Sequence, residues 1–442
     1  MRTIPEIAAL RSRCGVLRIP PELDVPVTPR VRNLIDTPAF RRLAQISQLG
    51  LVSLVYPAAN HTRFEHSLGV YRMALLFLDR LAEDSRFAAV VEPRDAEHFL
   101  VAALLHDVGH WPFCHPLEDM ALPGLPRHEE FARRFLQEGE IAEVLVREWK
   151  IDPDEVLAML TGKGKGPTGK ILQSLLSGPI DVDKMDYLMR DSLHAGVPYG
   201  RNFDQARLIQ SLCLDEHAHR LAISEKGKTA AEMMVFARYV MFSEVYWHHA
   251  VRSATAMFQR AFVLLHDRLE PQSLFALTER PFIDQMLASA GEGPAYELLD
   301  GLFGSSRRLY KRVAGYSLFQ EPELYQRLAR KPFTWLVRCA TNVAQLAASA
   351  LGRKVAPHEV LFDAPPVKLE VQFQIGVHFA KEDCYRPLGE ISPVVETLAR
   401  RQFDDYVKRV RIFAHPRIAA DIAALDDLPA LVTEATKSTA NC

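Results

Sequence analysis

The sequence predicts a mainly α-helical protein that ends in a small α+β lobe. Apolar residues recur at helical spacing over 66–82, 95–106, 128–149 and 229–268. From about residue 355 the pattern changes, because Val367–Phe379 alternates apolar and polar residues as a half-buried strand does. These two patterns together define the predicted fold class, a helical core followed by a mixed region.

The earlier elements can be justified in chain order. Pro20–Pro29 carries too many prolines to be helical throughout. Thr37-Pro38 is typical of a helix start, since proline is favoured at the first helical position. The stretch 161–169 predicts a surface loop. It resembles the first half of a phosphate-binding loop, but Ile171 stands where a Ser or Thr would ligate magnesium, so that motif is rejected.

The C-terminal region follows the alternating segment with a predicted helix at 392–408 and a strand at Val410–Ala414. The tail from about 428 is weakly patterned, which predicts fraying. We therefore expect an N-terminal extension, a helical core, a helical extension and the small α+β lobe. Their limits are 1–30, 31–265, 266–354 and 355–442.

Composition excludes several classes of protein. The 442 residues include 53 basic and 55 acidic ones, and a net charge of −2 gives no strong nucleic-acid signal. No apolar run reaches the roughly 18 residues that a membrane span needs. Met1–Arg13 lacks the apolar stretch of a secretory signal. The six cysteines are scattered without a CxxC pair, which favours a reduced, cytoplasmic setting.

A mixed set of histidines and carboxylates marks the candidate chemistry. His66, His106, Asp107 and Asp183 form a nitrogen and oxygen donor set that suits Fe, Mn, Zn or Ni, with positions left for water and substrate. Adjacent side chains diverge by about 100° on a regular helix, so His106 and Asp107 can share a metal only at a helix end. Gly109 supplies such an end. Each residue alone could equally cap a helix or face solvent.

Further polar residues follow at helical spacing. Asp183, Tyr187, Arg190 and Asp191 lie at i, i+4, i+7 and i+8, which places them on one helical face. This spacing supports a polar cavity beside the candidate metal ligands.

Three sequence blocks carry a family resemblance. They are RFEHSLGV (Arg63–Val70), HDVGHWPFCH (His106–His115) and DVDKMDY (Asp181–Tyr187). The chain resembles the HD-domain phosphohydrolases, and among them the deoxynucleoside triphosphate triphosphohydrolases of the dGTPase and SAM-and-HD-domain enzyme branch. The resemblance covers about 31–260 strongly and much of 300–416 weakly.

The resemblance implies one tightly bound divalent transition metal. The implied ligands are His66, His106, Asp107 and Asp183. His115 would protonate the leaving ribose 5′-oxygen, with Glu118 as its orienting carboxylate where the family has Asp. His110 and His128 would contact the phosphates, although His128 could instead be an exposed residue at a helix start. Mg²⁺ or Mn²⁺ would accompany the substrate triphosphate.

The resemblance also implies a nucleotide-binding set. Gln48, Leu49 and Asp191 would face the sugar, Arg63, Lys184, Tyr187 and Arg238 the phosphates, and Tyr246 would stack on the nucleoside. Gln48 could also be an ordinary polar helix residue. The sequence departs from the family at Phe242, which replaces a His, and at Trp247, which replaces a polar residue near the base. Base and sugar preference are therefore not carried over.

A nucleotide effector and a homo-oligomer, a dimer or tetramer, are further implications. Lys226, Arg307 and Lys311 match basic positions of an effector phosphate site that the mammalian enzyme holds between subunits. Arg41 and Ala44 depart from its nucleotide-reading positions, so guanine-type activation is not expected. This basic stretch could equally be a solvated face or contact an acidic partner.

The expected function is hydrolysis of deoxynucleoside triphosphates to deoxynucleoside and inorganic triphosphate. One alternative is the same fold acting on a ribonucleotide, a guanosine alarmone or a nucleoside monophosphate. Another is a nucleotide-sensing regulator with little turnover. Inorganic triphosphate among the products separates the first two, and the retained ligands and acid weigh against the third.

Overall fold

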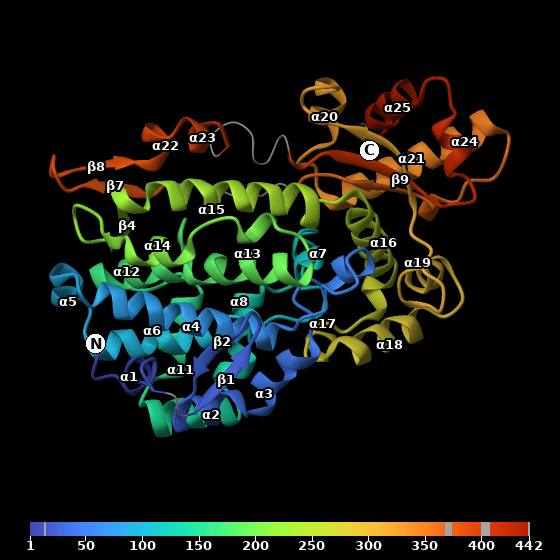
Figure 1. Ribbon diagram of the computed structural model, residues 1–442. Coiled ribbons are helices and arrows are strands. Elements are labelled where there is room, and N and C mark those ends of the chain that lie inside the picture. Colours follow the sequence, from blue (N-terminus) through green and yellow to red (C-terminus); the bar gives the residue numbers. More distant parts are fainter. Residues whose placement is uncertain (13–14, 367–373, 399–406, 441–442) are drawn as a thin grey trace.

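The computed structural model describes residues 1–12, 15–366, 374–398 and 407–440 (Figure 1). The helices of the first half are α1 (Pro5–Ala9), α2 (Pro29–Ile35), α3 (Pro38–Arg41), α4 (Arg63–Leu81), α5 (Ser85–Val90), α6 (Pro93–Leu105), α7 (Cys114–Glu118), α8 (His128–Phe131), α9 (Arg133–Leu136), α10 (Glu140–Val144), α11 (Pro153–Leu160), α12 (Gly166–Leu176), α13 (Val182–His194) and α14 (Gln205–Gln210). Those of the second half are α15 (Lys228–Met241), α16 (His249–Leu265), α17 (Pro271–Leu274), α18 (Glu279–Ala290), α19 (Pro294–Phe303), α20 (Pro322–Leu328), α21 (Phe333–Leu351), α22 (Leu388–Ile391), α23 (Pro393–Glu396), α24 (Ala419–Ala423) and α25 (Leu428–Ala440).

The strands of the described residues form three small sheets. They are β1 (Val16–Ile19), β2 (Leu23–Pro26), β3 (Leu212–Leu214), β4 (Leu221–Ser224), β5 (Lys311–Tyr316), β6 (Val360–Asp363), β7 (Gly376–Phe379), β8 (Cys384–Pro387) and β9 (Val410–Ala414). Their orders are β1-β2, β3-β4-β7-β8 and β5-β9-β6. The pair β4–β7 is parallel, and the other pairs are antiparallel. The predicted mainly α fold with a small α+β lobe is confirmed.

The core is built around α4, which packs against both α6 and α13. Figure 1 shows these helices in stacked rows beneath α15. The start of α4 is fixed by Thr62, whose hydroxyl accepts from the Glu65 N–H. A capping box of Glu92 and Asp95 starts α6. The apolar faces of α4 and α6 are fully buried, so they hold their ends, where the candidate ligands lie, in fixed positions.

Two predicted helices are correct and two are broken. The stretches 66–82 and 95–106 correspond to α4 and α6. The stretch 128–149 is divided into α8, α9, α10 and a π-helical turn. Gly139, whose φ is 79°, separates α9 from α10. The stretch 229–268 is divided into α15 and α16 by a second π-helical turn, Phe242–Tyr246.

The C-terminal tail is helical where the sequence predicted fraying. The tail after 428 is the helix α25, which packs against α21 and buries Val432 and Ala435 completely, so the predicted fraying is wrong. These residues share one helical face with Leu428, a pattern too sparse to stand out in the sequence. At the other end Ile4, Ile7 and Val25 belong to the hydrophobic core of the helical region.

Three other predictions are revised. The loop at 161–169 ends early, since α12 begins at Gly166 with a proline in its first turn. The predicted strand at 367–379 is seen over Gly376–Phe379, and 367–373 lie outside the described residues. The predicted helix at 392–408 is seen as α23, and 399–406 lie outside the described residues. The strand predicted at Val410–Ala414 is confirmed as β9.

The C-terminal region serves two sheets. Strands β6 and β9 pair with each other and, through β9, with β5 in the lobe, whose core includes Val343 and Val410. Strands β7 and β8 instead extend the sheet of β3 and β4 in the helical core. The domain limits proposed from the sequence are kept as a proposal, with 376–387 assigned by pairing to the core sheet. Across the described ranges no helix is both long and apolar enough to cross a lipid bilayer.

Candidate metal centre and active site

Three helix ends bring the predicted metal ligands together. His66 lies in the first turn of α4, His106 and Asp107 follow the last turn of α6, and Asp183 lies in the first turn of α13. His66 Nε2 is 3.3 Å from His106 Nε2 and 3.1 Å from Asp183 Oδ1. His106 Nε2 is 3.3 Å from Asp107 Oδ1 and 3.9 Å from Asp183 Oδ1. The adjacent His and Asp thus converge at a helix end, as their spacing required.

These distances fit a shared metal ion. Ligands about 2.1 Å from one ion lie about 3.0 Å apart in octahedral geometry and about 3.4 Å apart in tetrahedral geometry. The other ring nitrogens are already engaged: His66 Nδ1 is 2.9 Å from Asp186 Oδ2, and His106 Nδ1 is 2.9 Å from the Ala103 carbonyl oxygen. Such contacts orient the Nε2 lone pairs of metal-bound histidines. The donor set present therefore suits a divalent ion held through both Nε2 atoms.

The charges of the pocket favour a cation at the same point. Although burial lowers it, hydrogen bonds to Asp183 and Asp186 raise the pKa of His66 to about 10. Burial raises the pKa of Asp107, but His110, His106 and Arg63 hold it well below its usual value. A proton on His66 would therefore lie among several carboxylates. A divalent metal bound at the same point would displace that proton.

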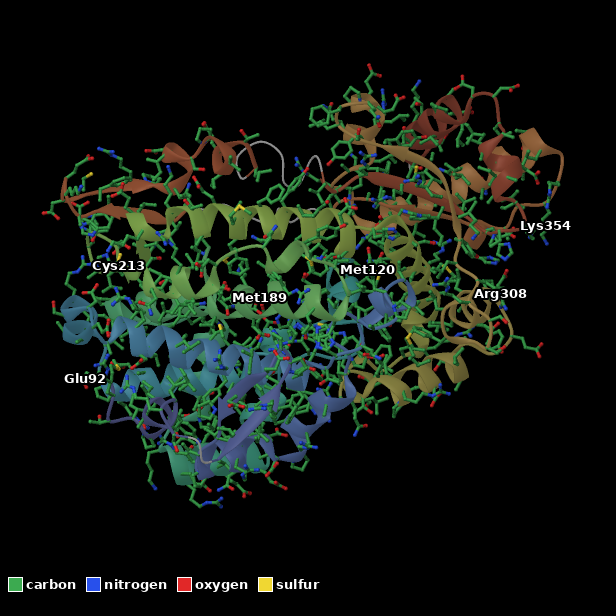
Figure 2. The ribbon with its side chains drawn as sticks, in the orientation of Figure 1. Glu92, Met120, Met189, Cys213, Arg308 and Lys354 are labelled. Atoms are coloured by element: carbon green, nitrogen blue, oxygen red, sulfur yellow. The ribbon has the colours of Figure 1, made fainter. Side chains whose placement is uncertain are left out.

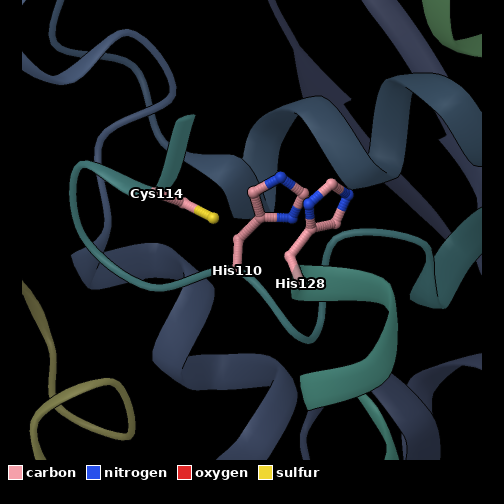
Figure 3. Close-up of side chains that lie close together, drawn as sticks. All are labelled: His110, Cys114 and His128. Atoms are coloured by element: carbon pink, nitrogen blue, oxygen red, sulfur yellow. The ribbon is translucent and has the colours of Figure 1, made fainter. Parts of the chain in front are cut away.

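The loop after α6 brings a second group of side chains together. The rings of His110 and His128 lie 3.8 Å apart between centroids, and Figure 3 shows both beside the Cys114 sulfur. The ligand atoms of these residues lie within 4.8 Å of one another. Burial lowers the pKa of His110 well below its usual value and raises that of the Cys114 thiol well above, so both are neutral. At Gly109 a Cβ would lie 2.1 Å from the His128 carbonyl oxygen, which explains glycine there.

The predicted acid and its carboxylate are adjacent. His115 Nδ1 is 3.5 Å from Glu118 Oε2, and the His115 side chain is 62% exposed. His128 Nδ1 is 2.9 Å from Glu118 Oε1, so one carboxylate contacts both rings. Although desolvation by neighbouring groups lowers it, Glu118 raises the pKa of His115. Phe113, just before α7, holds a left-handed φ of 57°, and this strained residue sets where α7 begins.

Two of the predicted phosphate-binding cations are held by carboxylates. Arg63 Nη1 donates to Asp107 Oδ2 at 2.8 Å, so it bridges to a candidate metal ligand. Lys184 Nζ donates to Asp181 Oδ2 at 2.6 Å. Each cation is thereby oriented beside the metal centre.

The predicted nucleoside side of the site also assembles. Tyr246 donates to Asp191 Oδ2 at 2.6 Å, and its ring is 6.4 Å from that of Tyr187. Phe242 lies 5.0 Å from Tyr246, with the Arg238 guanidinium 5.4 Å from its centroid. Burial and Asp191 raise the pKa of Tyr246 well above 10, which keeps its hydroxyl a donor.

Two further predicted positions differ in their surroundings. The Gln48 N–H donates to the His61 carbonyl oxygen in an isolated strand-like contact. The Gln48 Oε1 is buried and has no hydrogen-bond partner. Leu49 packs beside the core. Trp247, expected near the base, is 4% exposed and stacks on Arg252 at 3.9 Å, while its carbonyl accepts from Arg411. Its contacts are with α16 and β9, so Trp247 anchors the lobe.

The sequence comparisons agree with this geometry. A family model described as HD domain matches residues 63–191, and a second, described as HD associated region, matches 203–427. The chain belongs to the HD-domain phosphohydrolase family. The metal-ligand candidates all fall within the matched HD domain, which is a divalent-metal-binding fold.

The relatives of this HD-domain chain include uncharacterized proteins, deoxynucleoside triphosphate triphosphohydrolases and solved structures. An uncharacterized protein of Methanocaldococcus jannaschii is 30% identical over 85% of this chain and 74% of its own length. Human deoxynucleoside triphosphate triphosphohydrolase SAMHD1 is 30% identical over 55% of this chain and 43% of its own length, so this chain spans less than half of it. A solved structure of a hypothetical protein from Aquifex aeolicus is 27% identical with a TM-score of 0.71, covering 92% of this chain and 98% of that one.

The HD-domain chain does not bring the three effector candidates together. Lys226 follows β4 at the start of α15, whereas Arg307 follows α19 and Lys311 begins β5, beyond the far end of α15. Fourteen helical residues span about 21 Å. Figure 2 shows Arg308 at the edge of the molecule opposite Cys213 of the β3-β4 sheet. Arg307 itself donates to the Leu54 carbonyl oxygen.

Several residues around the site were not assigned a role from the sequence. Asp186 contacts His66 and pairs with Arg190 at 2.7 Å, and Arg190 pairs with Glu65 at 2.6 Å. The i, i+4 spacing of Asp186 and Arg190 is a helix ion-pair signal that could have identified them. His61 contacts Asp191 at 2.9 Å, and no spacing rule predicts that contact.

Proposed function

We propose that this HD-domain phosphohydrolase cleaves deoxynucleoside triphosphates to deoxynucleoside and inorganic triphosphate. The observation that carries the proposal is the convergence of His66, His106, Asp107 and Asp183 at one point, with His115 and Asp191 on neighbouring elements. The named activity of the SAMHD1 relatives supports the choice of substrate. Water would cleave the substrate's bond between the α-phosphorus and the ribose 5′-oxygen, which gives deoxynucleoside and inorganic triphosphate.

The four ligand residues would hold one divalent transition metal, Fe, Mn, Zn or Ni. When bound, the metal supplies Lewis-acid polarisation of a phosphoryl oxygen and lowers the pKa of water. Asp186 and the Ala103 carbonyl bind the Nδ1 atoms of the two imidazole rings and so orient the Nε2 atoms for metal binding. Mg²⁺ or Mn²⁺ would arrive with the substrate phosphates.

His115 is the proposed general acid. Because Glu118 raises its pKa, a larger fraction of the imidazole is protonated near neutral pH. The exposed ring can reach a bound substrate, and its proton would pass to the leaving 5′-oxygen. Glu118 also holds His128, so the carboxylate keeps the acid and a phosphate-contacting ring in one arrangement.

Cations fixed by carboxylates would receive the triphosphate. Arg63 and Lys184 are each oriented by a single acceptor, which leaves their other N–H groups for phosphate oxygens. Arg238 would add a third cation, and the Tyr187, Phe242 and Tyr246 rings would enclose the nucleoside. His110, whose pKa burial holds well below its usual value, and His128 would contact phosphate oxygens through N–H groups.

A nucleotide effector remains part of the proposal in a specific form. Since Lys226 lies far from Arg307 and Lys311 within one chain, a site using all three would need two chains. The proposal therefore ties effector binding to a homodimer or homotetramer. Sedimentation with and without nucleotides tests it, and an unchanged monomer would contradict it.

The deciding experiment is chromatographic. Metal-loaded protein is incubated with each deoxynucleoside and ribonucleoside triphosphate, singly and mixed, in Mn²⁺ and then Mg²⁺. Deoxynucleoside and triphosphate in equal amounts are expected, with none from Asp107→Ala. Release of orthophosphate or pyrophosphate would reject the proposed bond cleavage. Intact deoxynucleotides beside cleaved alarmones, ribonucleotides or monophosphates would move the activity to that substrate, and tight binding without products would favour a sensor.

A further inference from the structure

Helix α16 carries two buried arginines, and only one of them is paired with a carboxylate. Arg252 donates to Oδ1 of Asp363 on β6 from Nη2 at 2.6 Å and from Nε at 3.0 Å. Arg260, about two helical turns later, is 6% exposed, and its Nε is buried without a partner. Among the residues that the structure describes, nothing forms a hydrogen bond or an ion pair with its guanidinium. The second cation of α16 is therefore not neutralised by the chain around it.

The unpaired Arg260 lines a small cavity where α16 meets the lobe. The wall also includes Ala256 of α16, Phe333 and Leu336 of α21, and Val360–Phe362 of β6. Its remaining residues are apolar as well, so the charge of the wall comes from Arg260. Arginine stays protonated in proteins, and a buried charge is costly unless it is paired. The cavity therefore favours a ligand that carries a negative charge.

A second buried donor lies near this guanidinium. The hydroxyl of Tyr310, just before β5, is buried and has no hydrogen-bond partner in the described part of the chain. Burial raises the pKa of Tyr310, so this hydroxyl keeps its proton and can donate. Burial lowers the pKa of Arg260 and Tyr310 raises it, an interaction that requires the two side chains to be close. Arg260 and Tyr310 thus both offer donor groups that lack an acceptor.

We propose that this cavity binds a small monocarboxylate, such as formate or acetate, through the guanidinium of Arg260. The planar fork of arginine N–H groups matches the two oxygens of a carboxylate. One cation balances one negative charge, whereas a phosphate would bring extra charge and more polar oxygens against an apolar wall. The hydrogen atom of formate or the methyl group of acetate would instead contact Phe333 and Leu336.

The carboxylate site is separate from the proposed active site. None of the residues that line the cavity is a metal-ligand candidate or a predicted nucleotide contact. Its walls come from α16 on one side and from α21 and β6 of the lobe on the other. A bound carboxylate would therefore stabilise the junction between helical core and lobe, and its binding can be measured without any substrate.

The test follows thermal unfolding of metal-loaded wild type, Arg260→Met and Arg252→Met. Sodium formate or acetate is added, with sodium chloride at equal ionic strength as the reference salt. The Tm of wild type should rise with carboxylate concentration, because a ligand that binds the folded state stabilises it by mass action. Arg260→Met should lose this response. Calorimetric titration should show its affinity for carboxylate lowered by about 10- to 100-fold, the range for hydrogen bonds to a charged group.

The same variants separate binding from folding. In the reference salt Arg260→Met should melt at the temperature of wild type or above, because it removes an unpaired buried charge. Arg252→Met should melt lower, since Asp363 loses its direct partner, but should keep the response to carboxylate. Equal carboxylate responses in wild type and Arg260→Met would overturn the proposal, and so would equal responses of wild type to carboxylate and chloride. If Arg260→Met does not fold, Arg260→Lys keeps the charge without the planar fork, and an unchanged carboxylate affinity in it would overturn the proposal.

Discussion

A Cβ atom at Gly69 would lie 1.9 Å from Oδ1 of Asp186. Gly69 is one helical turn after His66 in α4, and Asp186 is the residue that orients His66. The missing side chain is therefore what lets the α13 carboxylate reach the metal-ligand histidine. Close approach, and not backbone conformation, requires glycine here.

Gly69→Ala should weaken the metal site. The methyl group must push Asp186 away from His66, and loss of an orienting partner typically costs about 10- to 100-fold in metal affinity. Competition with a metal chelator measures the loss. Gly389→Ala is the matched control, because a Cβ there meets nothing within 4 Å. Equal affinities in the two variants would contradict the orienting role of Asp186.

His106→Gln should lower the bound metal from about one ion per chain to near none, because a catalytic site rarely holds its metal with one protein ligand missing. Elemental analysis after dialysis measures it. His98→Gln is the control: it lies on the same helix, contacts Glu155 at 3.0 Å and is outside the cluster. A variant of His106 that stays fully metallated would show that the ligand set is wrong.

Glu118→Gln should change the pH dependence of kcat. Glu118 raises the pKa of His115, so removing its charge lowers that pKa. An acid is active below its pKa, and the fall in rate on the alkaline side should therefore move to lower pH. At neutral pH we expect a loss of about 10- to 100-fold, part of what acid catalysis contributes. Glu129→Gln should leave the alkaline limb in place, although Glu129 also approaches His128.

Arg190→Met should destabilise the fold strongly. The Arg190 side chain is 2% exposed and pairs with Asp186 and Glu65. Removing one partner of a buried pair leaves uncompensated charge and costs about 3–5 kcal/mol. Urea unfolding measures the change. Arg280→Met, which breaks a pair whose arginine is 78% exposed, should change stability by less than about 1 kcal/mol. Similar losses of stability in both variants would show that the buried Arg190 pairs contribute no more to stability than the exposed Arg280 pair.

The sequence predicted those features that are local. The helix ends at His66 and at His106 and Asp107 were readable because each lies within a few residues of its own cap. Contacts that depend on how helices cross could not be predicted from the sequence. Spacing gave no sign that His61 would reach Asp191, since the two come from separate elements. Spacing also gave no sign that Trp247, which follows a π-helical turn, would contact Arg252.

The path of the chain after β6 has a consequence for dissecting this protein. It leaves the lobe, adds β7 and β8 to the sheet beside β4, and returns to the lobe as β9. The two regions are interleaved, so no single cut separates them. Truncation before β6 would strip the core of two strands and expose the edge of β4, a surface prone to edge-to-edge aggregation. Proteolysis is therefore expected to yield either the intact molecule or insoluble fragments.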